Sequence, residues 1–329
     1  MNQWSEYLAK QKVEDLQIKN SLCALDNMSL LYVGGDDATD FLQSQLSNDI
    51  HAIDEHSIQL SSFSNAKGRM LGIFRVVKID GGYLLLMPSS ILPSIQQQLQ
   101  KFIIRSKVIL ADITDSFACF SLVTDKQELI TNELLPSQIN LVYQSDSLIS
   151  VRLQDIGDQF RYIVMSNDAE EAIRLWTSFT KPLQINSSEN WRLQEIQSGV
   201  PALFPQTEAA FVLQMSNLQI IDGVSFKKGC FPGQEVVARM QYLGKLKRRM
   251  YLAEIQTTIC PSPGDELCSR ESEKADGSGK VVDAVQLTPD LCILLFIAQI
   301  DKADNNQLVL FAQPDKSITL KELPYPVTQ

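Results

Sequence analysis

The hydrophobic pattern of the chain changes near residues 244 to 250, and this change limits the folds open to it. Before these residues, apolar residues with strand-like spacing alternate with apolar residues at helical spacing. After them, strand-length apolar stretches are separated by Pro, Gly, Asp and Asn, with no convincing helix. We therefore expect an α+β fold whose C-terminal part is a small antiparallel barrel or sandwich.

The region before the change predicts two similar α+β units. In the first, residues 28–33 are typical of a strand, the stretch "NAKGR" (65–69) of a hairpin turn and residues 89–104 of a helix. The same alternation recurs from about 116 to 184, without a strict repeat. The expected domains are a first α+β unit at 1–115, a second at 116–243 and a C-terminal β-barrel at 244–329.

Composition predicts a cytoplasmic protein with more than one core. The chain has 329 residues, 44 % of them hydrophobic, and its longest purely apolar run, 291–298, is far shorter than the roughly 20 residues of a membrane span. Six scattered cysteines, with no C-x-x-C pair, indicate reduced thiols and no metal site. The two histidines, in "HAIDEH", are typical of a polar loop.

The net charge of −10 argues against stable binding to nucleic acid, because a phosphate backbone would be repelled at long range. Any nucleic-acid role is expected to be indirect or transient. Positive charge is concentrated locally, at Lys227, Lys228 and the run "GKLKRR" (244–249).

Residues 226–235, "FKKGCFPGQE", combine a turn, two lysines and a single thiol. Pro232 and Gly233 suit the two central positions of a type II turn, and "QEVVARMQYL" has helical spacing. Cys230 would then precede a helix N-terminus, where the dipole and the two lysines favour thiolate over thiol. Cys230 is therefore a candidate catalytic residue for redox chemistry or thiol exchange; the alternative is a small buried residue in a turn.

The stretch "KKGCFPGQEVVAR" resembles the Lys-Gly-Cys-aromatic-x-Gly-Gln-Glu signature of the YgfZ family of folate-binding, tRNA-modification proteins. That family is related to the glycine-cleavage T-protein, an aminomethyltransferase, and to mitochondrial iron–sulfur assembly factors. Residues 34–50, 65–69 and 244–250 resemble further stretches of the family, so the resemblance covers nearly the whole chain. It implies two ferredoxin-like α+β units and a β-barrel, arranged as a ring around a central folate-binding channel.

The resemblance implies folate, as tetrahydrofolate or a derivative, as the cofactor. Family members hold the folate between two tryptophans; here one position is Trp191 and the other aligns with Met28, whose thioether cannot replace an indole face. Lys227, Lys228 and Arg239 are candidates for the glutamate tail of folate. The implied folate-binding residues are Trp191, Met28, Lys228, Gly229, Gln234, Glu235, Arg239 and Glu195.

Two departures from the aminomethyltransferases bear on mechanism. The carboxylate that accepts both pterin N–H groups there corresponds to Gln197, with Glu195 two residues away. The aminomethyltransferases also have an Asp pair, one carboxylate of which serves the transfer chemistry, and its positions correspond to Gly72 and Ile73. We therefore expect no glycine-cleavage activity.

The function implied is a folate-binding accessory protein that supports iron–sulfur enzymes, particularly those that thiolate tRNA, with indirect effects such as on replication initiation. One alternative is a folate-dependent one-carbon transferase or demethylase that uses Glu235 or Glu195 as acid or base. Another is direct tRNA binding through "KLKRR" and the lysine pair at 227 and 228, which the net charge disfavours.

Overall fold

A computed structural model describes residues 2–130, 133–242, 244–272 and 274–327 of the chain. The chain divides into two compact units, each made of several chain segments. Unit 1 comprises Met1–Phe41, Ile50–Gln59 and Phe74–Gln194, and unit 2 comprises Leu42–Asp49, Leu60–Ile73 and Glu195–Gln329. The three domains expected from the sequence remain a prediction.

The first sheet of unit 1 has six strands in the order β11-β1-β7-β10-β9-β8, antiparallel except for the parallel pair β1 and β11. Its strands are β1 (Ser21–Ala24), β7 (Ala118–Thr124), β8 (Val142–Gln144), β9 (Leu148–Ile156), β10 (Gln159–Ser166) and β11 (Gln184–Asn186). Its helices are α1 (Asn2–Leu8), α4 (Gln127–Ile130) and α5 (Ala169–Thr180). Asp168 caps α5 by accepting hydrogen bonds from the backbone N–H groups of Glu170 and Glu171.

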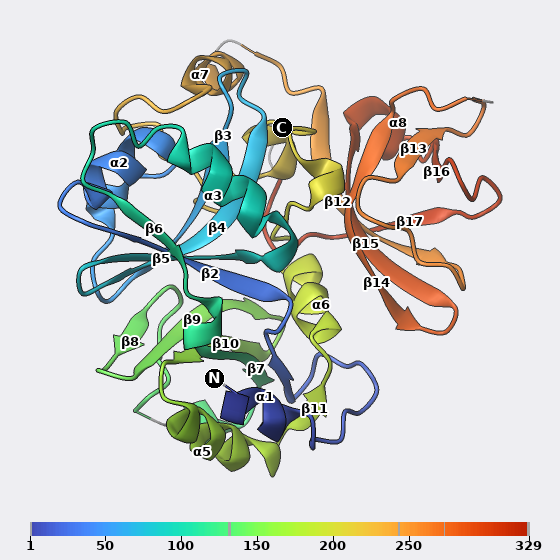
Figure 1. Cartoon of the computed structure of the whole chain (residues 1–329). Helices are drawn as coiled ribbons and strands as arrows, with labels where there is room; N and C mark the ends of the chain where they lie inside the picture. The colour runs from blue at the N-terminus through green and yellow to red at the C-terminus, as the bar shows by residue number, and fades with distance from the viewer. Residues whose placement is uncertain (1, 131–132, 243, 273, 328–329) are drawn as a thin grey trace. The chain divides into compact units, whose positions relative to one another are not determined.

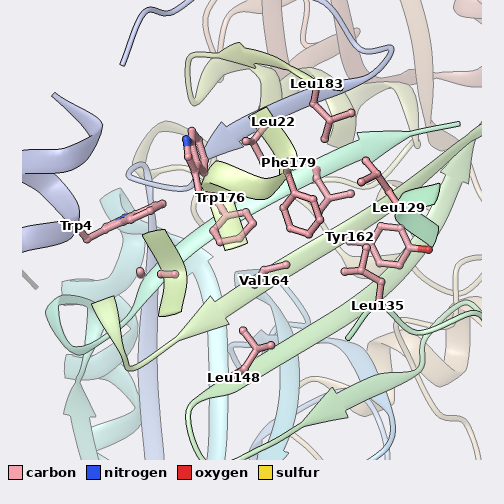
Figure 2. Packing of buried hydrophobic residues seen from close by; sticks show 14 residues of the cluster. Trp4, Leu22, Leu129, Leu135, Leu148, Tyr162, Val164, Trp176, Phe179 and Leu183 are labelled. Carbon is pink, nitrogen blue, oxygen red and sulfur yellow. The ribbon is translucent and has the colours of Figure 1, made fainter. Parts of the chain in front are cut away.

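Helices α1 and α5 contribute apolar side chains to a cluster that also includes residues of this sheet (Figure 2). At its centre, the ring of Trp176 makes edge-on contacts with Trp4 and Phe120, at centroid distances of 5.4 and 5.5 Å. These large rings bury much apolar surface, which stabilises the helices on the sheet.

A second sheet has the strand order β3-β4-β5-β2-β6. Its strands are β2 (Met28–Gly34), β3 (Ile58–Ser64), β4 (Met70–Ile79), β5 (Gly82–Pro88) and β6 (Ile109–Asp112). Strands β3 and β4 pass along the chain from one unit into the other, as do α2 (Ala38–Gln45) and α6 (Glu189–Gln197). The predicted strand at 28–33 is confirmed by β2. The predicted helix at 89–104 is shorter, because a 3-10 turn (Ser89–Ile91) precedes α3 (Leu92–Gln100).

Unit 2 contains a six-stranded antiparallel sheet in the order β16-β13-β14-β15-β12-β17, drawn in orange and red in Figure 1. Its strands are β12 (Arg248–Gln256), β13 (Glu266–Ser269), β14 (Gly279–Thr288), β15 (Leu291–Gln299), β16 (Leu308–Leu310) and β17 (Ile318–Lys321). Shorter elements are the 3-10 turns Pro205–Thr207 and Leu213–Ser216, and α7 (Gln234–Tyr242). This sheet confirms the expectation that the C-terminal part is rich in antiparallel strands.

Two expectations about the C-terminal part are wrong. The structure has a helix there, α8 (Ile300–Asp304), whose five residues are too few to show helical periodicity. The thiols are not all reduced: Cys260 and Cys292 form a disulfide, with their Cα atoms 5.7 Å apart. Because β12 pairs with β15, the loop after β12 returns close to Cys292. Pairing of this kind is a tertiary property that cysteine spacing did not reveal.

The mixture of helices and strands agrees with the α+β class expected from the sequence. Within the described ranges, helices are all too short or too polar to cross a lipid bilayer.

Candidate functional site

Three segments that are far apart in sequence meet in unit 2: residues 43–48 at the end of α2, the hairpin turn 65–69, and residues 223–236. We call residues 226–235 the cysteine corner. Each of these segments belongs to a stretch that the sequence analysis singled out, and the contacts below show how they hold one another.

The first contact joins residues 223–228 to the loop after α2. The hydroxyl of Ser47 donates to the carbonyl of Gly223 at 2.7 Å, and the N–H of Ser225 donates to the carbonyl of Ser47 at 3.1 Å. The side-chain amide of Asn48 donates to the carbonyl of Asp222 at 2.6 Å. Ser47 is fully buried, so its bond to Gly223 is protected from water, and the three bonds together fix the approach to the cysteine corner.

The second contact is made by Lys228, whose side chain is 8 % exposed. Its ammonium group donates to the backbone carbonyls of Gln43 and Leu46, both at 2.5 Å, and of Asn48 at 3.1 Å. The same nitrogen lies 5.4 Å from the ring centroid of Phe231, in a cation–π contact. Burial lowers the pKa of Lys228 to about 8, and the charge of Asp49 opposes this shift. Three carbonyls match the three hydrogens of the ammonium, so Lys228 fastens the corner to the end of α2.

The third contact is between two turns. The N–H of Gln234 donates to the carbonyl of Phe231 at 3.1 Å, and Gly233 has a φ of +83°, which confirms the predicted type II turn. Gly233 lies against Gly68 of the hairpin turn so closely that a Cβ on Gly233 would be 2.4 Å from the Gly68 Cα. Asn65 holds the hairpin turn by accepting from the N–H groups of Lys67 and Arg69.

The cysteine corner presents its thiol to solvent. Cys230 is exposed and Gly229 beside it borders open space, whereas Cys23, Cys119 and Cys268 are buried or half-buried. Burial raises the pKa of Cys23 and of Cys119 to about 12. Of the four free cysteines in the described part of the chain, Cys230 is therefore the accessible one, and it is not the buried turn residue of the alternative interpretation.

Helix α7 begins at Gln234, four residues after Cys230, as predicted. Gln234 is half-buried, while Glu235 and Arg239 are exposed on this helix. Glu195 lies near the end of α6 and is 6 % exposed. Gly72 and Ile73 are buried in β4, so that point of the strand offers no carboxylate.

The remaining two predicted residues lie in unit 1. Trp191 is 2 % exposed and shares an apolar cluster with Met28. The guanidinium carbons of Arg75 and Arg161 lie 5.2 and 5.5 Å from the indole centroid. The sequence analysis did not propose these two arginines as site residues. Each is a charged residue inside an apolar strand, and this pattern could have identified them.

A hollow of about 510 Å³ lies in unit 2, and none of the predicted catalytic or folate-binding residues lines it. It is lined by residues 249–252, by Asp304 and by residues 320–327. The described residues contain no cluster of three or more His, Cys, Asp or Glu side chains that could hold a metal ion.

No family model matches the chain. It is 31 % identical over 310 residues to the tRNA-modifying protein YgfZ of Colwellia psychrerythraea, which covers 92 % of this chain and 93 % of that protein. Proteins with the same name from Photobacterium profundum and Yersinia enterocolitica are 28 % and 27 % identical, over 95 % and 98 % of this chain and 93 % and 98 % of their own length.

Among solved structures, the glycine cleavage system aminomethyltransferase T of Bartonella henselae matches with a TM-score of 0.65. The match covers 98 % of this chain and 89 % of that one, at 13 % sequence identity. A match at this identity shows a common fold, and the chemistry must be argued from the residues present.

Proposed function

The chain belongs to the family of tRNA-modifying YgfZ proteins, and from this premise we propose that it is a folate-binding accessory protein that supports tRNA modification. The single observation that carries the proposal is the cysteine corner. Three separated segments, each similar to a stretch of the family, hold one exposed thiol in a defined place. The T-protein fold supports the folate part of the proposal, because that fold accommodates a folate-dependent enzyme.

In the proposed arrangement, the α+β parts form two ferredoxin-like units that complete a ring with the C-terminal sheet, around a channel for the folate. The support is the full-length similarity to the aminomethyltransferase fold. The three domains would then be 1–115, 116–243 and 244–329, and the protein would act in the cytoplasm, without binding a membrane.

Cys230 is proposed to exchange thiols with iron–sulfur enzymes that thiolate tRNA. In this step the thiolate of Cys230 attacks one sulfur of a client disulfide, a mixed disulfide between Cys230 and that sulfur forms, and the client's other sulfur leaves as a thiolate. Its exposure supports this role, since such a step needs a sulfur that another protein can reach. Indirect effects such as on replication initiation would follow from altered tRNA modification.

The folate contacts are proposed as two sets that are tested separately. In unit 1, Trp191 and Met28 would contact the pterin ring, which requires the ligand to take the place of one guanidinium group at the indole. In unit 2, Glu195 would bind pterin N–H groups. The other proposed contacts in unit 2 are Gly229, Gln234, Glu235 and Arg239, with Lys227 for the glutamate tail and Lys228 holding the corner in place.

Calorimetric titration with tetrahydrofolate tests the folate sets. We expect Trp191→Phe and Glu195→Gln each to weaken binding about tenfold, because the first replaces the indole by a smaller ring and the second removes a charged acceptor. Trp4→Phe, in the other apolar cluster of unit 1, is the matched control and should bind as the native chain does. Equal affinity of Trp191→Phe and the native chain removes Trp191 from the site, and no heat with any folate refutes the cofactor.

The thiol role is tested in cells that lack the native gene. Cys230→Ser should lower the thionucleoside content of bulk tRNA, measured by mass spectrometry, whereas Cys268→Ser should restore the native content because Cys268 is buried. Full thiolation with Cys230→Ser would exclude the exchange role.

The alternative of a one-carbon transferase is tested with aminomethylated lipoyl carrier protein. Because Gly72 and Ile73 stand where the transferase carboxylates are expected, we predict no methylene-tetrahydrofolate above the blank. Product formation at a rate above the blank would establish the transferase in place of the accessory protein.

A further inference from the structure

Positive charge gathers on one short part of this acidic chain. Residues 226–249 contain seven basic side chains and one acidic side chain, while the whole chain carries a net charge of −10. The basic residues are Lys227, Lys228, Arg239, Lys245, Lys247, Arg248 and Arg249, and the acidic residue is Glu235. A local excess of this kind creates a positive field at short range that the rest of the chain does not share.

Some of these cations have structural partners. Lys228 binds three carbonyls, Arg248 donates to the carbonyl of Gly277 at 2.6 Å, and Arg249 pairs with Asp304 at 3.0 Å. The others are exposed, and so is Lys67 at the hairpin turn. We call the five exposed cations the basic strip: Lys67, Lys227, Arg239, Lys245 and Lys247. In the described part of the chain, none of the five has an ion pair.

Contacts along α7 bring three members of the strip together, namely Lys67, Arg239 and Lys227. Gly68 packs on Gly233 and on Val236, where a Cβ on Gly68 would lie 3.1 Å from the Val236 Cβ, so Lys67 lies at the first turn of α7. Figure 1 shows α7 beside the tip of the hairpin that β3 and β4 form. Arg239 follows Val236 by three residues and therefore lies on the same side of the helix.

At the other end of α7, the ring of Tyr242 contacts the ring of Phe226 edge-on at a centroid distance of 6.3 Å. This contact places Lys227, the next residue after Phe226, at the last turn of the helix. These three cations thus follow the nine residues of α7, a length of about 13 Å at 1.5 Å per residue, and Lys245 and Lys247 come after its last residue in the sequence. This length is enough to meet more than one phosphate of a nucleic-acid strand.

An exposed aromatic side chain lies within the strip. Tyr242 is 68 % exposed, although it is a large apolar ring whose position is supported by Phe226. Exposed aromatic rings among Lys and Arg side chains are typical of surfaces that bind single-stranded nucleic acid, where the cations meet phosphates and the ring stacks on a base. An exposed Tyr among cations also suits an interface with an acidic protein, so the choice between the two partners rests on the proposed role in tRNA modification.

We propose that the basic strip is a docking surface for RNA, with the cations on the phosphate backbone and Tyr242 stacked on an unpaired base. The choice of RNA rests on the proposed role in tRNA modification, but not on folate. Because the chain as a whole is acidic, docking is weak and transient and is lost as salt rises. It therefore agrees with the expectation that the chain forms no stable complex with nucleic acid.

The test is fluorescence anisotropy of a labelled, unmodified tRNA transcript with the full chain, in 25 to 200 mM KCl and without folate. The logarithm of the affinity should fall linearly with the logarithm of the salt concentration. For Lys227→Gln/Arg239→Gln the slope should be shallower by about 1.4, at about 0.7 per lost phosphate contact. Tyr242→Ala should weaken binding about tenfold at each salt concentration and leave the slope unchanged.

The matched control is Lys101→Gln/Arg105→Gln, which removes the same charge from exposed residues of unit 1. It should bind tRNA as the native chain does. Absence of binding at 25 mM KCl overturns the proposal, and so does equal weakening by the control pair. Competition by polyglutamate as strong as that by tRNA would make the strip a surface for acidic proteins instead.

Folate binding and RNA docking can fail independently. A chain that binds tetrahydrofolate but not the transcript refutes the docking surface alone. A chain that binds the transcript but no folate refutes the proposed cofactor and leaves the docking surface in place. Circular dichroism of each variant confirms that a lost signal is not lost folding.

Discussion

At the scale of single residues, Lys228 is a motif residue whose side chain binds backbone carbonyls elsewhere in the same chain. The sequence analysis proposed it for the glutamate tail of folate, beside Lys227 and Arg239. In the structure its ammonium is engaged by the carbonyls of Gln43, Leu46 and Asn48, so an anion could bind it only by displacing a carbonyl. Its neighbour Lys227 is exposed, and the two lysines therefore have different physical roles.

Replacing Lys228 should destabilise the protein. In Lys228→Met the methionine fills much of the same volume but leaves buried carbonyls without their donor, so we expect the free energy of unfolding to fall by about 2–4 kcal/mol. Lys227→Met removes the same charge from an exposed position and should change it by less than about 0.5 kcal/mol. Urea unfolding followed by circular dichroism measures both, and similar values for the two variants would contradict the role of Lys228.

The pH dependence of stability has a definite sign at Lys228. Its pKa is about 8 in the folded chain and 10.5 in the unfolded chain, so between these values the unfolded state binds more protons. The free energy of unfolding of the native chain, relative to Lys228→Met, should therefore rise by about 1–2 kcal/mol from pH 8 to pH 10. The pKa of Tyr325 is raised by burial to about 12, which lowers the stability of both proteins above pH 10 and therefore cancels in this comparison.

Urea unfolding of the two proteins at several pH values between 7 and 10 measures the difference. If the free energy of unfolding of the native chain, relative to Lys228→Met, falls as the pH rises, folding favours the charged lysine and the lowered pKa is refuted.

At the scale of elements, the cysteine corner and the hairpin turn depend on each other through two glycines. Gly233 needs a positive φ for its type II turn, and Gly68 occupies the space into which a side chain would project. Gly229, two residues upstream of Phe231, differs, because a Cβ added to it would meet no other atom within 4 Å. Of these two glycines of the motif, Gly233 therefore requires the absence of a side chain, and Gly229 does not.

Gly233→Ala and Gly229→Ala form a matched pair that tests this difference. Gly233→Ala combines left-handed strain with a backbone clash, so we expect a loss of about 2–4 kcal/mol in the free energy of unfolding. Gly229→Ala should stay within about 0.5 kcal/mol of the native value. Hydrogen exchange should also show faster exchange in α7 and at residues 65–69 for Gly233→Ala only; equal effects of the two substitutions would refute the packing described.

At the scale of the whole molecule, unit 1 has two apolar clusters and unit 2 has another, yet the two units share continuous elements. Strand β4 and helix α6 each begin in one unit and end in the other. All three tryptophans, Trp4, Trp176 and Trp191, belong to unit 1, so their fluorescence reports on that unit.

Because β4 and α6 each belong to both units, we expect the two units to unfold together. A strand that loses half of its length loses ladder hydrogen bonds on both sides of the division, so partial unfolding is costly. Gly233→Ala, in unit 2, should therefore shift the tryptophan fluorescence midpoint in urea as far as the circular dichroism midpoint. An unchanged fluorescence midpoint would show that the units unfold independently.

The order of elements could be predicted along much of the chain, because strand and helix periodicities depend on neighbouring residues. The strand at 28–33, the turn at Gly233 and helix α7 are examples. Helix α8 and the bond between Cys260 and Cys292 could not, since one is too short to have a period and the other depends on which strands pair.

The sequence by itself determined the α+β class, the motif around Cys230 and the family, because these follow from local periodicity and from the order of residue types. Only the tertiary structure decided that Lys228 is occupied by carbonyls, that Gly68 backs Gly233, and that Trp191 is enclosed by Arg75 and Arg161. The physical reason is that hydrogen bonds, close packing and burial depend on distances between residues remote in sequence, and no local pattern contains those distances.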